Sequence, residues 1–181
     1  MRESVMAGDI PVARNDVSTT LRLVVFSLDN QRYGLSLECV QRAIRVVAIT
    51  PLPGAPAIVL GIIDLGGTII PAVDIRARFG HSPRDVSLSE HLIIARTGKR
   101  TVALLVDETS GVIECSPEKV VPVGEILPGL AFIDGAVKLV NGLILIHDLE
   151  RLLSLEEETA IDHALSAAAG TGAPGHGMPH P

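Results

Sequence analysis

Histidines and cysteines are the residues of this sequence with the widest chemical range. Cys39 and Cys115 do not form a CxxC motif, and neither has a histidine or asparagine beside it in the sequence. His176 and His180 could hold a soft metal, but the intervening Gly-Met-Pro prevents display on one helix face. These patterns favour two reduced thiols in a cytoplasmic protein, with no metal site and no cofactor.

Carboxylates and basic pairs offer the next chemistry. Asp74 and Asp148 could act as acid–base residues, but each precedes a short apolar helical segment, so helix capping is the stronger expectation. The sequence has no GxSxG elbow, P-loop, paired-histidine metal motif or kinase signature, which argues against an enzyme. Basic pairs fit either solvated surfaces or recognition of an acidic partner. These pairs are Arg42 with Arg45, Arg76 with Arg78, and Lys99 with Arg100.

Composition narrows the class of partner. The 181 residues carry a formal net charge of −6 and four aromatic residues (Tyr 1, Phe 3, Trp 0), which argues against a nucleic-acid binder. Mean hydropathy is high at +0.40. The longest apolar run, residues 55–75, nevertheless contains Asp64, Asp74 and two prolines, which makes it a poor spanning helix. We expect no direct membrane insertion, and no secretory signal is visible.

The elements that must position these residues are mostly strands. Residues 1–20 predict a disordered arm, residues 21–155 the folded region, and the Ala/Gly/Pro-rich residues 164–181 a tail without a core. After Ser36 we expect a short helix, with Leu37, Val40 and Ile44 on one face. Asp148 is expected to cap a longer helix. Strands are expected at 21–28, 32–35, 58–65, 68–73, 91–95, 101–106, 137–140 and 143–146.

An internal repeat connects the two halves of the chain. Adding 74 to each residue number converts Gly61 into Gly135, and Asp74 into Asp148, without a gap. The shared pattern is Gly-x-x-x-Leu, a turn, a strand, Asp and a helix. Two small barrels of similar plan would each bury little surface, so a shared apolar core between them is expected.

Several motifs together resemble the CheW family. Phe26-Ser-Leu-x-x-x-x-Tyr33-Gly-Leu, followed by Val40-Gln41, is similar to the family's opening. The central block, from Gly61-Ile-Ile-Asp-Leu-Gly-Gly through Pro71-Ala-Val-Asp74-Ile-Arg76-x-Arg78-Phe79-Gly80, resembles its signature most specifically. Leu104-Leu-Val-Asp107 through Val112, and Leu143 to Leu149, match the later strands. The resemblance covers about residues 21–155.

The resemblance implies a mainly β fold of two five-stranded SH3-like barrels around a common core, with short helices and a C-terminal helix. The first barrel would span about 21–85 and the second 86–155, with strand exchange possible, followed by a helical extension and tail over 156–181. It implies a non-enzymatic cytoplasmic adaptor, peripheral to membrane receptor arrays, that couples a chemoreceptor tip to a CheA-type histidine kinase. The implied receptor-binding residues of the interbarrel groove are Val40, Arg42, Ile44, Gly61 and Gly66. The implied kinase-binding residues are Leu92, Glu125, Ile126 and Leu127.

Two departures from the family pattern concern charge. The family often has Glu where this chain has Arg42, and Arg where it has Gly66. We therefore expect a partner tip that carries a carboxylate near Arg42, and possible service in an alternative chemosensory pathway. Two alternatives stay open: a small enzyme or ligand-binding barrel that uses the interbarrel groove, and a stand-alone regulator that binds the kinase without coupling receptors.

Overall fold

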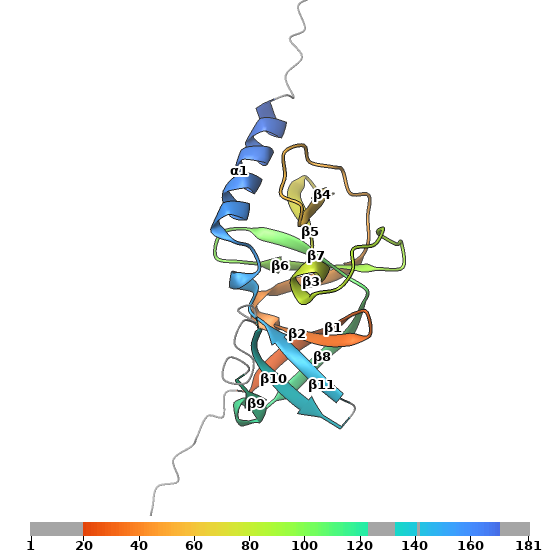
Figure 1. Ribbon diagram of the computed structural model, residues 1–181, viewed down its shortest axis with the longest axis vertical. Helices are drawn as coiled ribbons and strands as arrows, with labels where there is room; N and C mark the ends of the chain where they lie inside the picture. The colour runs from red at the N-terminus through yellow and green to blue at the C-terminus, as the bar shows by residue number, and fades with distance from the viewer. Residues whose placement is uncertain (1–19, 123–132, 141, 171–181) are drawn as a thin grey trace, which may run out of the picture.

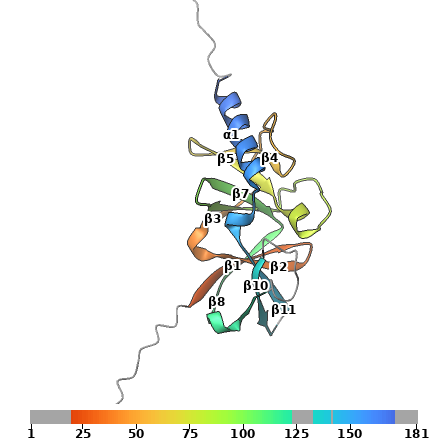
Figure 2. The same cartoon turned by 60° about the vertical axis from the view of Figure 1, so that its left-hand side comes forward.

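Two stacked β-barrels form the body of the molecule. The computed structural model describes residues 20–122, 133–140 and 142–170. In Figure 1, the barrel formed by the five-stranded sheet (barrel I) lies above the barrel formed by the six-stranded sheet (barrel II). Helix α1 (Leu155–Gly170) runs beside barrel I. The view turned by 60° shows the same stacking (Figure 2). Barrel I consists of β3 (Val40–Arg45), β6 (His91–Arg96), β7 (Thr101–Val106), β5 (Thr68–Asp74) and β4 (Val59–Leu65), in that order. Barrel II consists of β8 (Glu108–Cys115), β1 (Leu21–Leu28), β2 (Gln31–Ser36), β11 (Gly142–His147), β10 (Ile133–Leu139) and β9 (Val120–Val121).

Hydrogen bonds close barrel I between its two edge strands. The segment that follows β3 reaches β4 at Thr50, whose N–H donates to the carbonyl of Ile62 at 2.8 Å and whose carbonyl accepts from the N–H of Ile62 at 2.8 Å. In barrel II the edge strands β8 and β9 are joined by the short 3-10 helix η3 (Pro117–Lys119). In barrel I this closure reduces the number of unpaired edges open to non-specific association.

Three main apolar cores follow from this arrangement. Each barrel has a small interior core, centred on Leu92 and Leu105 in barrel I and on Leu23 and Val137 in barrel II. A larger core lies between the barrels and also receives Ile161 from α1. The expected mainly β fold with a shared core is therefore confirmed. The shared core is the largest because neither barrel is wide enough to bury much surface alone.

The internal repeat is confirmed strand by strand. In barrel I, Gly61 pairs with Ala72, and at the same offset of 74 residues Gly135 pairs with Ile146 in barrel II. A β-bulge precedes both glycines, after Val59 and after Ile133. Equal registers and equal bulges show that both segments fold as the same strand–turn–strand unit.

The two barrels also exchange hairpins. The β1–β2 hairpin corresponds to β6–β7, since Val24 faces Leu35 as Ile93 faces Leu104. Yet β1–β2 pairs with the late strands β8 and β11, whereas β6–β7 pairs with the early strands β3 and β5. The expected boundary between residues 85 and 86 therefore does not separate the barrels. The exchange ties both halves of the chain into both barrels.

The helices differ from expectation at two places. The helix expected after Ser36 is a single 3-10 turn, η1 (Leu37–Cys39), because Val40 and the following residues pair with β6. Asp148 does cap a helix, but this is the short η4 (Leu149–Arg151), and α1 begins separately. Residues 164–170 continue α1, with Ala164 buried, so the expected tail begins later than residue 164.

Some expectations fall outside the described residues. The arm at 1–19 and the segment 171–181 are among them, and so is Asn141 of the β10–β11 turn. Within the described part of the chain, no helix is both long and apolar enough to cross a membrane.

Candidate partner-binding surfaces

Strand β3 holds three of the expected receptor-binding residues. Val40 is half-buried and packs against the shared core, opposite Ala95 of β6. Ile44 is also half-buried but packs into barrel I. Arg42 lies between them and is exposed. A bulge between Val40 and Arg42 turns the strand, so these side chains do not share one face.

The two glycines of the receptor set have different environments. Gly61 is buried with φ 152°, and a Cβ there would lie 2.2 Å from the carbonyl oxygen of Thr50. Its absent side chain lets the barrel close at the Thr50–Ile62 contact. Gly66 is exposed with φ 65° in the β4–β5 turn, where Asp64 Oδ1 accepts from the N–H of Gly67 at 2.7 Å. Asp64 thus stabilises the turn, and only Gly66 lies on a surface.

One residue of the expected kinase-binding set is buried in the structure. Leu92 is 0% exposed and lies inside barrel I, because its side of β6 faces the interior. It contributes packing, and its assignment to a kinase contact is wrong. Glu125, Ile126 and Leu127 lie outside the described residues.

An apolar groove that the sequence did not indicate lies on barrel I, directly after β3. Three of its larger aliphatic residues are exposed: Val47 at 38%, Val86 at 39% and Leu88 at 83%. This barrel I groove is lined by Val46, Val47, Ala48, Ile49, Leu60, Val86 and Leu88. None of these side chains titrates. The signal in the sequence was weak, because residues 46–49 and 86–88 are far apart and come together only in the fold.

A buried arginine joins the strands near the crossover between barrels. Arg76, in the 3-10 helix η2 (Arg76–Phe79), is 0% exposed and pairs with Asp74 at 3.3 Å, with Asp107 at 2.9 Å and with Glu90. Asp107 also receives Arg84. Burial alone would raise the pKa of Asp107, but the hydrogen bonds and charges of its arginine partners hold it below its ordinary value.

Other residues of the basic pairs also form ion pairs within the chain, which leaves them less suited to recognising a partner. Arg100 pairs with Glu158 and Asp162 of α1, at 2.7 Å each, and Arg78 pairs with Glu157. Buried or half-buried guanidiniums need such partners to offset their desolvation. Of the six basic residues, those of β3 remain the exposed pair on a candidate binding strand.

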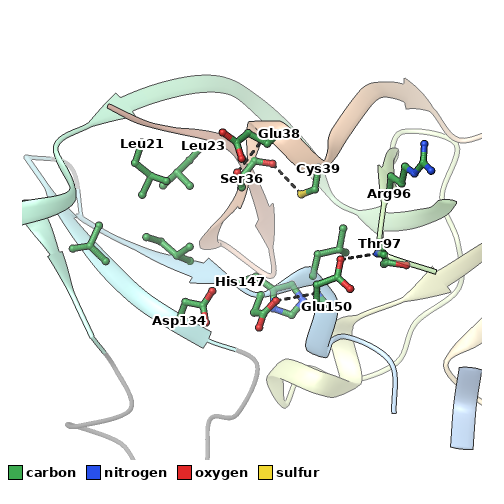
Figure 3. Close-up of a pocket in the computed structure, with 15 residues that line it drawn as sticks. Leu21, Leu23, Ser36, Glu38, Cys39, Arg96, Thr97, Asp134, His147 and Glu150 are labelled. Carbon is green, nitrogen blue, oxygen red and sulfur yellow. Dashed lines mark hydrogen bonds between the residues drawn. The ribbon is translucent and has the colours of Figure 1, made fainter. Parts of the chain in front are cut away.

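An open pocket lies between the barrels (Figure 3), with Leu21 and Leu23 on an apolar side. Two of its carboxylates accept backbone hydrogen bonds. Glu150 Oε1 accepts from the N–H of Gly98 at 2.8 Å, and Asp148 Oδ1 accepts from the N–H of Glu150 at 2.9 Å. Because this pocket lies between the barrels, its side chains test the alternative of an enzyme that uses the interbarrel groove.

Cys39 is the nucleophile that such an enzyme would have in this pocket. Its thiol donates to the carbonyl of Ser36 at 2.9 Å, and burial raises its pKa. A thiol with a raised pKa stays protonated near neutral pH and is a poor nucleophile. Burial, together with the charge of Asp148, also raises the pKa of Asp134. The protonated Cys39 thiol therefore argues against a thiol-dependent enzyme in this pocket.

Comparison with known proteins gives the same class. Residues 22–157 match the family model described as CheW-like domain. The chain is 30% identical over 140 residues to a probable chemotaxis protein CheW of Rhizobium etli, covering 76% of this chain and 90% of that protein. It is 28% identical over 142 residues to the chemotaxis protein CheW of Klebsiella aerogenes, covering 77% and 86%.

A solved structure agrees with these sequences. The scaffolding protein TtCheW from Thermoanaerobacter tengcongensis superposes with a TM-score of 0.69 at 32% identity, covering 76% of this chain and 94% of that one. Fold and surfaces together define a two-barrel scaffold of the chemotaxis type. The chain belongs to the CheW family.

Proposed function

We propose that this chain is a non-enzymatic adaptor that binds a chemoreceptor tip and a CheA-type histidine kinase at the cytoplasmic face of a receptor array. The observation that carries the proposal is the barrel I groove, an exposed aliphatic surface without titratable side chains. A surface of this kind suits a protein partner with an apolar tip. Catalysis would instead require convergent polar groups.

The receptor tip is proposed to lie across β3 and the barrel I groove. Val46 to Ile49 follow β3 directly in the chain, so Arg42 and part of the groove lining belong to neighbouring segments. An apolar tip would bury Leu88, while a carboxylate on the same tip would meet Arg42. Coupling further requires that the adaptor bind two receptor or kinase states with different affinities, because equal affinities shift no equilibrium.

The Leu88→Ser variant tests this surface. We expect it to weaken binding of a receptor cytoplasmic fragment by about 1–3 kcal/mol, the range of an interface hot spot, with little loss of stability. Leu155→Ser is the matched control, since Leu155 is 74% exposed on α1 and distant in sequence from the groove. Calorimetry should show unchanged binding for the control. Equal affinities for both variants would contradict the assignment.

The kinase contact is proposed for the segment Glu125-Ile126-Leu127, by resemblance alone. Ile126→Ser should weaken binding of the kinase regulatory domain by about 1–3 kcal/mol while the receptor fragment still binds. Co-purification with kinase and receptor fragment, separately and together, distinguishes the adaptor from a stand-alone kinase regulator. A stand-alone regulator would retain the kinase and never the receptor fragment.

A further inference from the structure

The segment between η2 and β6 makes ionic contacts with both barrels. At its start, His81 Nε2 lies 2.9 Å from the Tyr33 hydroxyl, and His81 Nδ1 lies 3.2 Å from Asp29 Oδ2. Arg84 Nη1 lies 2.9 Å from Asp29 Oδ1. Asp29 and Tyr33 belong to the β1–β2 hairpin of barrel II. A segment that leads into barrel I is therefore tied to the other barrel.

The end of the same segment holds Leu88 in place. Glu90 is 3% exposed, and its Oε1 accepts from Arg84 Nη2 at 3.0 Å and from Arg76. Its Oε2 accepts from the N–H of Ser87 at 2.7 Å, and its own N–H donates to the Ser87 carbonyl at 3.1 Å. Both contacts close a turn from Ser87 to Glu90 that presents Leu88 to solvent. One carboxylate thus joins the ion cluster to a turn of the barrel I groove.

We propose that residues 81–90 are a strap that couples the contact between the barrels to the position of Leu88, with Arg84 and Glu90 as positioning residues. The identity of the partner that Leu88 binds rests on the proposed function, but the coupling does not.

The strap is suited to open locally. The Arg84 side chain is 43% exposed, whereas Arg76 is 0% exposed, so salt screens the pairs of Arg84 far more than those of Arg76. Loss of Arg84 leaves Asp74, Glu90 and Asp107 with Arg76 as their shared cation. Repulsion among these carboxylates then acts on Glu90 and the turn that it holds, while the shared apolar core still joins the barrels. Local opening of this kind needs no global unfolding.

Residue-level amide hydrogen exchange on the full chain tests the coupling. Asp29→Asn removes the ion pairs between the strap and barrel II and leaves Glu90 unchanged. Asparagine accepts the φ of 46° at that position. Asp29→Asn and Arg84→Gln should each speed exchange of the Ser87 and Glu90 amides about tenfold, while amides of β6 and β7 keep their rates. Raising salt from about 0.1 M to about 1 M, which shortens the Debye length to about 3 Å, should do the same to the wild type. Arg96→Gln, an exposed arginine outside the cluster, is the matched control and should change nothing.

Two results would overturn the strap. One is an unchanged exchange rate at Ser87 and Glu90 in Asp29→Asn, and the other is equal acceleration throughout β6 and β7, which would mean global destabilisation. Binding of the receptor fragment gives an independent reading. If exchange behaves as expected but Leu88→Ser binds normally, the strap stands and the proposed receptor surface fails.

Discussion

A structural role and a receptor-binding role for Gly61 predict different effects of substitution. The Gly61→Ala variant is therefore the sharpest test of the barrel architecture. The family resemblance places Gly61 in the receptor groove, but the structure places it against the backbone at the closure of barrel I. An added Cβ would lie 2.2 Å from the oxygen and 2.8 Å from the carbonyl carbon of Thr50, both of them backbone atoms. A φ of 152° adds strain for any side chain.

The magnitude follows from two contributions. Backbone strain at an unfavourable φ costs about 1–3 kcal/mol. Moving Thr50 away weakens its two 2.8 Å hydrogen bonds with Ile62, each worth about 0.5–1.5 kcal/mol. We therefore expect Gly61→Ala to lower the free energy of unfolding by about 3 kcal/mol. Urea denaturation followed by circular dichroism measures the change, which corresponds to a fall of roughly 6–12 °C in Tm for a domain of this size.

Two matched alanine variants calibrate the result. Gly66 has φ 65°, and a Cβ added there would have no heavy atom within 4 Å, so Gly66→Ala should cost only about 1 kcal/mol. Gly135, the repeat counterpart, would meet Val120 Cγ1 at 2.6 Å and the Val121 oxygen at 3.0 Å, which predicts an intermediate loss. If Gly61→Ala were no less stable than Gly66→Ala, the closure argument would be refuted. Receptor binding by the Gly61→Ala variant and by the wild type must be compared at the same folded fraction.

Three further predictions concern titration, the termini and charge. Burial raises the pKa of Tyr33 to about 12, so the stability that this group contributes below pH 10 should be lost as pH rises through 12, and Tyr33→Phe should remove that dependence in urea titrations. A chain of residues 21–167 keeps Ile161 and Ala164, and its thermal midpoint should stay within a few degrees of the full chain; a collapse would mean that a removed end packs on a barrel. Arg42→Glu should weaken binding of the cognate receptor fragment by about 1–3 kcal/mol, and adding Gly66→Arg should shift preference toward standard receptor tips. Unchanged affinity at low salt would leave the charge departure without a role.

The sequence was informative wherever a local pattern decided the structure. The Gly61 and Gly135 segments could be aligned because each carries its own turn and an aspartate that accepts from the N–H two residues further on. Asp148 is the N-cap of η4, whereas the N-cap of η2 is Ile75 and not Asp74. The segment after Ser36 misled for a physical reason: Leu37, Val40 and Ile44 fit a helical period, but pairing with β6 outweighs local propensity. The Asp148 helix was predicted at the correct start and with the wrong length, because Ser154 begins a second helix by accepting from the N–H of Glu157.

The candidate site was less accessible to sequence reasoning. Arg42 and Gly66 could be placed on surfaces, but Leu92 and Gly61 could not be distinguished from surface residues until pairing fixed which side faces inward. The barrel I groove is lined by residues more than thirty positions apart, such as Val47 and Leu88, and a single sequence carries no local signal for such a grouping.

The hairpin exchange makes each barrel depend on strands from both halves of the chain. Because β1–β2 completes the barrel built by the later strands, and β6–β7 the barrel built by the earlier ones, no barrel can form from one half of the repeat. The crossover from β7 to β8 passes through Asp107, which pairs with both Arg76 and Arg84. The shared apolar core and this ion cluster therefore both connect the two barrels. For an adaptor, a buried shared core beside exposed ion pairs that salt can screen would, on the strap proposal, let the segment that carries Leu88 respond while the barrels stay joined.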